Sequence, residues 1–89
     1  MHIITPIYTV YILRTSSNTL YIGQTNNLEK RMKEHREHKR GAKYMRSFDS
    51  FELVHTEEFK TRSEAMKREI ELKKLTKPQK ESLLASKLV

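Results

Sequence analysis

Glu69 is the carboxylate whose sequence surroundings most suggest a chemical role. Advancing about 100° per residue places it within one helical arc together with apolar residues, namely Ala65, Met66, Leu72 and Leu75. A charge on an apolar arc needs a cationic partner. Lys73 stands four residues later, at the spacing of a helical ion pair. A divalent cation is the other partner, since Mg²⁺ is often held by one or two carboxylates, waters and substrate phosphate.

Two tyrosines and a glycine have spacings that suit one face of a β-hairpin. Tyr11 alternates with Thr9 and Leu13, and Tyr21 alternates with Gly23, so both phenols are expected on one face of neighbouring strands. Packing with one hydrogen bond would account for either tyrosine. Gly23 is less usual, because a glycine inside a strand often marks a bulge or the close approach of a ligand or backbone.

Arg31 and His35 form a second pair of polar residues, four apart on an expected helix. They lie beside, and not on, the stripe of Leu28 and Met32 that should face the sheet. A solvated basic face is one explanation. A role in binding or proton transfer is the other, and it depends on which elements lie nearby.

Several other kinds of site have no support in the sequence. The chain has no cysteine, which excludes disulfides, thiolate zinc sites and cysteine nucleophiles. Its histidines do not have zinc-like spacing, and neither of the glycine-rich phosphate-binding motifs is present.

Charge is the strongest compositional signal. The 89 residues include 18 Lys and Arg against 11 Asp and Glu, a formal net charge of +7. Such a field attracts phosphate backbones without reading sequence. A merely soluble, well-charged surface is the simpler alternative.

The elements that would position these residues follow the order ββαβαα. An α+β fold is therefore predicted, a small three-stranded antiparallel sheet flanked by helices. Asn26 or Asn27, Ser63 and Thr76 are suitable N-caps, and Gly41 would end the first helix. The predicted strands are Ile7 to Leu13, Thr19 to Thr25 and Phe51 to Phe59, and the predicted helices are Leu28 to about Lys39, Glu64 to about Leu75, and Thr76 to about Ser86.

The length and the absence of a linker predict one domain over residues 1–89. The sequence contains neither a secretory signal pattern nor an apolar run of bilayer length. We therefore expect no membrane association and a cytoplasmic location, or a nuclear one if the host has a nucleus.

Taken together, these motifs resemble the GIY-YIG nuclease family. Thr9-Val10-Tyr11 and Tyr21-Ile22-Gly23 match the two tripeptides of the family name, and Arg31 and Glu69 follow at the family's spacings. Thr9 replaces the first glycine, and Gln24 stands where some members have lysine. The small stand-alone members, related to the nuclease domain of the bacterial excision-repair nuclease, are the most similar in length.

The resemblance implies metal-dependent hydrolysis of phosphodiester bonds and a role for each residue. Tyr11 corresponds to a general base or proton relay, and Tyr21 to a residue that orders water and phosphate. Arg31 corresponds to the stabiliser of phosphate charge, and His35 to a histidine that assists proton transfer. Glu69 corresponds to the sole protein ligand of one divalent metal ion, Mg²⁺ or Mn²⁺.

The sequence therefore leads to the hypothesis of a metal-dependent DNA endonuclease, with repair as a compatible pathway. The first alternative is a nucleic-acid-binding module of the same fold that cleaves weakly or only with a partner. A second alternative is a protein that binds an acidic partner, in which Glu69 pairs with Lys73 and no metal binds. Duplex, branched and single-stranded DNA all remain open as substrates. The residues expected to contact nucleic acid are Gly23, Gln24, Lys30, Lys39, Arg40, Lys43 and Arg46.

Overall fold

A three-stranded antiparallel sheet lies at the centre of the fold in the computed structural model, which describes residues 6–37 and 50–86. The strands are β1 (Tyr8–Thr15), β2 (Leu20–Thr25) and β3 (Phe51–Phe59). Their spatial order is β2-β1-β3, so β1 is central and pairs with both neighbours.

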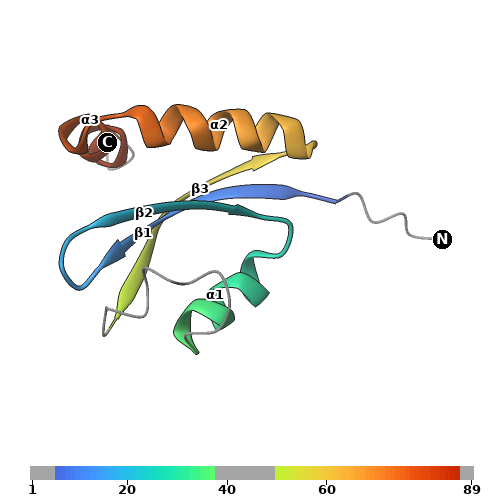
Figure 1. The fold of residues 1–89 in the computed structure, drawn as a ribbon, viewed down its shortest axis with the longest axis horizontal. Helices are drawn as coiled ribbons and strands as arrows, with labels where there is room; N and C mark the ends of the chain where they lie inside the picture. Colours follow the sequence, from blue (N-terminus) through green and yellow to red (C-terminus); the bar gives the residue numbers. More distant parts are fainter. Residues whose placement is uncertain (1–5, 38–49, 87–89) are drawn as a thin grey trace.

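Helices cover both faces of this sheet (Figure 1). One face carries α1 (Leu28–Arg36), and the opposite face carries α2 (Arg62–Lys74) and α3 (Lys77–Ala85). The predicted α+β class and the order ββαβαα are confirmed.

Two apolar clusters follow from the alternation of side chains along the strands. Val10, Ile12 and Ile22 point to the α2 side, where they pack with Ala65 and Leu72. The α1 side holds a smaller cluster built on Tyr11, Leu13 and Met32. Tyr11 and Tyr21 therefore belong to the small apolar layer between the sheet and α1.

A β-bulge in β3 changes which side chains face each helix. Leu13 pairs with Leu53 and Ile12 pairs with His55, so Val54 is an extra residue without a partner of its own in β1. A bulge of this kind breaks the regular alternation of faces. As a result Phe51 packs with the α1-side cluster, whereas Val54 packs with the α2-side cluster.

The C-terminal ends of β1 and α1 differ from their predicted positions. The first strand extends to Thr15 because its last residues also pair with β3, where Thr15 lies opposite Phe51. Asn27 caps α1 as predicted. The helix ends at Arg36, with Glu37 as its C-cap, before the predicted Lys39. The predicted stop at Gly41 lies outside the described residues.

The beginning of α2 was predicted wrongly at Ser63. Thr61 is the N-cap: its backbone is extended and its hydroxyl accepts a hydrogen bond from the amide of Glu64. Thr61 and Ser63 both offer a hydroxyl group near this helix start. Thr61 is the cap because its own backbone is extended, outside the helical region. The predicted apolar arc was also too broad, since Met66 is exposed while Ala65 and Leu72 are buried. Thr76 caps α3 as predicted, together with Gln79 in a capping box.

Among the described residues, none of the helices combines the length and apolar character required to cross a membrane.

Candidate active site

Tyr11 lies at the centre of the candidate site, on the middle strand. It is fully buried and pairs with Gly23 across the β1–β2 ladder. A Cβ atom added at Gly23 would lie only 2.5 Å from the Tyr11 hydroxyl oxygen. The phenol therefore lies directly over Gly23, and the close approach foreseen at this glycine is made by Tyr11.

His35 is the direct partner of Tyr11. Its Nε2 lies 3.0 Å from the Tyr11 hydroxyl oxygen, and its side chain is only 1% exposed. The solvated basic face that was one explanation for His35 is thus excluded. Nδ1 of the same ring is buried and has no hydrogen-bond partner in the part of the chain that the structure describes.

Aromatic rings enclose the imidazole. The rings of Tyr11, Tyr21 and Phe51 contact His35 edge to face, with centroid separations of 5.9, 5.5 and 5.9 Å. Tyr11 and Tyr21 are 6.4 Å apart, so the expectation that both phenols share one face is confirmed. Phe51 had no sequence signal, because the bulge that turns it toward His35 cannot be located from strand periodicity.

Arg31 reaches the same cluster from one turn earlier on α1. The positive charge of its guanidinium favours the ionised form of the Tyr11 phenol and lowers the pKa of that group. Arg31 Nε also lies 3.3 Å from a carboxylate oxygen of Glu34, close enough for an ion pair but without hydrogen-bond geometry. The arginine is therefore only loosely held and retains capacity for an anion.

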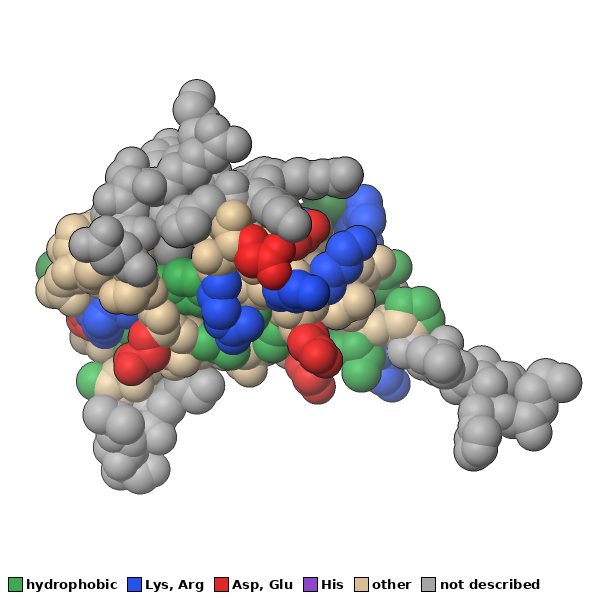
Figure 2. Space-filling view, turned by 90° about the horizontal axis from the view of Figure 1, so that it is seen from below, with side chains coloured by type: hydrophobic (Ala, Val, Ile, Leu, Met, Phe, Trp, Pro, Cys, Tyr) green, Lys and Arg blue, Asp and Glu red, His purple; other side chains and the backbone are tan. Residues whose placement is uncertain are grey.

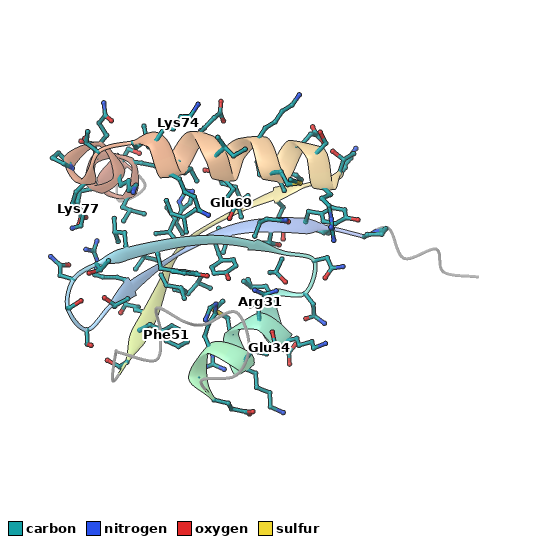
Figure 3. The ribbon with its side chains drawn as sticks, in the orientation of Figure 1. Arg31, Glu34, Phe51, Glu69, Lys74 and Lys77 are labelled. Atoms are coloured by element: carbon teal, nitrogen blue, oxygen red, sulfur yellow. The ribbon has the colours of Figure 1, made fainter. Side chains whose placement is uncertain are left out.

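Glu69 extends from α2 toward the sheet, whereas Arg31 lies on the α1 side (Figure 3). The Glu69 side chain is 20% exposed, and one of its oxygens lies 3.0 Å from Nζ of Lys73. The ion pair expected from the spacing is present. The negative charge of Glu69 also acts on Tyr11 and raises the pKa of its phenol.

The environment keeps both Tyr11 and His35 neutral near pH 7. Burial raises the pKa of the Tyr11 phenol far above its ordinary value, with Tyr21 and Glu69 acting in the same direction and Arg31 opposing them. Burial lowers the pKa of His35, and the positive charge of Arg31 lowers it further. The pair thus consists of a protonated phenol and a neutral imidazole.

The residues expected to contact nucleic acid lie in different places. Gly23 is buried beneath Tyr11, and Gln24 faces the opposite side of the sheet, beside Val10 in the ladder. Lys30 lines a hollow along α1 that the sequence analysis did not identify. The residues that line this hollow are Asn27, Glu29, Lys30, Lys33 and Arg36. Its three basic residues, Lys30, Lys33 and Arg36, are spaced three apart in the sequence. Lys39, Arg40, Lys43 and Arg46 lie outside the described residues.

The surface on the α1 side is not uniformly basic. Figure 2 shows Lys and Arg side chains interleaved with carboxylates on this face. Among the described residues of this face, charge of both signs lies close together, so a phosphate backbone would meet separate cationic positions there.

The residues present fit a weakly held divalent cation. No group of three or more His, Asp or Glu side chains forms a ready-made metal cage within residues 6–37 and 50–86. Glu69 alone offers a partly buried carboxylate whose present partner is a lysine ammonium. One carboxylate, completed by water and substrate phosphate, is a donor set that Mg²⁺ commonly uses.

Comparison with known proteins identifies the family of this chain. Residues 7–82 match the family described as the GIY-YIG catalytic domain. The chain belongs to the GIY-YIG family. A nuclease class and a nucleic acid substrate follow from that membership, and nucleases of this family generally use a divalent metal.

Relatives of the same small size support the GIY-YIG assignment. A UPF0213 protein of Natronomonas pharaonis is 49% identical over 76 residues, which cover 85% of this chain and 88% of the relative. One from Clostridium perfringens is 48% identical over 80 residues, covering 90% and 85%. Their names specify no substrate or reaction.

Two solved structures share the fold of this chain. The solution structure of the UPF0213 protein BH0048 from Bacillus halodurans has 38% identity and a TM-score of 0.61, covering 91% of this chain and 85% of the other. That of the protein EF2693 from E. faecalis has 37% identity and a TM-score of 0.62, covering 93% and 88%.

Proposed function

We propose that this GIY-YIG chain is a metal-dependent DNA endonuclease, folded as one domain over residues 1–89. The observation that carries the proposal is the hydrogen-bonded Tyr11–His35 pair, whose phenol is acted on by the charges of both Arg31 and Glu69. Phosphodiester hydrolysis needs an oriented water and stabilisation of developing negative charge. These side chains supply both requirements.

The proton path is set by the neutral Tyr11–His35 pair. In this scheme His35 is the tautomer whose Nε2 accepts from the Tyr11 hydroxyl, and the phenol oxygen accepts a proton from the attacking water. As the water oxygen bonds to phosphorus, the water proton passes to Tyr11 and the phenol proton passes to His35. The P–O bond to the leaving oxygen breaks, and that oxygen takes a proton from solvent.

Arg31 and Glu69 deal with charge in this scheme. Arg31 stabilises negative charge on the phosphate and on the Tyr11 oxygen during the transfer, and Tyr21 helps to orient the water and phosphate. Glu69 would hold the divalent ion, which supplies Lewis-acid stabilisation of the phosphate when bound. Lys73 must release Glu69 for the ion to bind there.

A nucleic-acid-binding module with weak or partner-dependent cleavage is the second candidate. The Glu69–Lys73 ion pair favours it, because it satisfies the carboxylate without a metal ion. The same pair was expected if the chain instead bound an acidic partner. Metal-dependent cutting separates these candidates from an endonuclease.

The deciding experiment is cleavage of labelled single-stranded, duplex and branched DNA at low salt with Mg²⁺ or Mn²⁺. Wild-type chain is compared with Glu69→Ala and with Glu58→Ala, which removes an exposed carboxylate of β3. We expect metal-dependent cutting that is lost only in Glu69→Ala. Binding without cutting on every substrate would instead establish the binding-module function.

A further inference from the structure

An ionic cluster on the α2 side of the sheet is not used by the proposed chemistry. Glu57 of β3 accepts hydrogen bonds from Arg68 of α2, with Nε–Oε1 and Nη2–Oε2 distances of 2.7 and 3.1 Å. The same Oε2 lies 2.7 Å from Nε2 of His55. Glu57 therefore contacts a histidine of its own strand with one oxygen, and two nitrogens of a helix guanidinium with both oxygens.

The burial of this cluster makes its geometry well defined. The His55 side chain is 5% exposed, and those of Glu57 and Arg68 are 23% and 32% exposed. A two-pronged arginine–carboxylate contact fixes direction as well as distance. Arg68 has a second, longer contact with Glu71 of its own helix at 3.5 Å, which does not tie α2 to the sheet.

Apolar packing alone defines the rotation of α2 poorly. Ala65 and Leu72 are the buried residues of this helix, whereas Met66 and Ile70 are 46% and 51% exposed. Two contacts on one narrow stripe allow a helix to roll about its axis more easily than a broad interface would. A directional contact beside the stripe opposes such a roll.

Arg68 immediately precedes Glu69, and the two side chains leave the helix about 100° apart. Any roll of α2 that moves Arg68 also moves the Glu69 carboxylate relative to Tyr11. We propose that His55, Glu57 and Arg68 are positioning residues that set the rotation of α2 and thereby hold Glu69 at the site. The inference rests on the proposed role of Glu69 as metal ligand.

The chain offers a matched control in the Arg14–Glu81 ion pair. Arg14 donates to both oxygens of Glu81 at 2.9 and 2.8 Å, and the side chains are 29% and 35% exposed. This pair has nearly the same geometry and exposure, but it joins β1 to α3. Its loss should cost comparable stability without moving Glu69.

The test is a Mn²⁺ titration of isotope-labelled full-length chain followed by paramagnetic broadening of amide NMR signals. Wild type, Arg68→Met, Glu57→Gln and Arg14→Met are compared, with thermal midpoints recorded for each. Arg68→Lys keeps the charge without the two-pronged contact, and serves if Arg68→Met does not fold. We expect the Mn²⁺ midpoint at Glu69 to weaken by about tenfold when Arg68 is changed, as for other outer-shell supports, and to stay unchanged in Arg14→Met.

A double variant, Glu57→Gln with Arg68→Met, should weaken Mn²⁺ binding no more than Arg68→Met alone, because both changes disrupt the same Glu57–Arg68 contact. Broadening at Glu69 that is equal in wild type and the Arg68 variants would overturn the positioning role while leaving the metal ligand in place. Equal weakening in Arg14→Met would also overturn it, by showing a general stability effect. Absence of broadening near Glu69 in wild type would overturn the metal ligand itself, and the inference with it.

Discussion

The hydroxyl oxygen of Tyr11 lies 3.0 Å from Nε2 of His35, and both side chains are buried. A phenol with a raised pKa does not ionise by itself near pH 7. In the proposed reaction, the adjacent imidazole, whose pKa is lowered by burial, would accept the phenol proton as a water proton replaces it. The two residues would then act as one proton-transfer unit.

Tyr11→Phe should abolish this unit while keeping the fold. We expect cleavage to fall by about 10²- to 10⁴-fold, the usual contribution of a positioned acid or base, and stability to change by only about 1 kcal/mol for the lost hydrogen bond. The measurement is the single-turnover cleavage rate. Tyr8→Phe, a half-buried tyrosine of the same strand that packs on the α2 side, is the control and should cleave normally.

The lowered pKa of His35 predicts a pH dependence of stability. Because the folded-state pKa lies below the ordinary value of about 6.5, the unfolded chain binds the proton first as pH falls. Stability should therefore decrease from about pH 6.5 downward until the folded-state pKa is passed. NMR titration of His35 and urea midpoints at several pH values test this, and a weaker pH slope is expected in His35→Gln. Titration of His35 above pH 6.5 would contradict it.

Gly23→Ala should damage the site through a steric clash. The new methyl group would lie 2.5 Å from the Tyr11 oxygen and 2.6 Å from its Cζ, so the fully buried phenol must shift and disturb its packing. We expect a loss of about 1–3 kcal/mol in unfolding free energy, typical of overpacking, and a displaced Tyr11 hydroxyl. In a Tyr11→Leu background the same change should cost much less. Equal costs in both backgrounds would refute the clash.

The hollow on α1 predicts a salt-dependent contribution to nucleic acid binding. Lys30→Gln and Lys33→Gln should each reduce the slope of log K against log salt by about 1. Binding is measured with the Glu69→Gln variant, so that cleavage does not interfere. Lys74→Gln is the control, because Lys74 lies on the side of α2 away from the sheet (Figure 3). An equal effect of Lys74→Gln would show that only total charge matters.

The strands and helices were largely predictable because their signals are local. Alternation located β1 and β2, an apolar run with Leu53 and Val54 located β3, and the side chains of Asn27 and Thr76 marked two helix starts. Thr61 was missed because Ser63 offers an equally suitable hydroxyl, and backbone conformation decides between them. Local patterns do not contain that information.

In the candidate site, too, the contacts that follow from local spacing were predictable and those that depend on long-range strand register were not. Spacing placed Tyr11 and Tyr21 on one face and Arg31 with His35 on one helix, as the structure has them. The contact of Phe51 with His35 and the Glu57–Arg68 pair depend on a long-range register. Sequence periodicity predicted neither, since a bulge reverses the faces partway along β3.

The bulge makes β3 sensitive to the deletion of a residue at Val54. The extra residue, Val54, allows Phe51 to reach His35 on one side of the sheet while Glu57 reaches Arg68 on the other. Deleting Val54 would restore regular alternation and reverse the faces on one side of the deletion. Either the aromatic enclosure of His35 or the ionic anchor of α2 would then turn away from its partner. Loss of this one residue would therefore remove either the Phe51–His35 contact or the Glu57–Arg68 contact, a larger disruption than most substitutions in either group would cause.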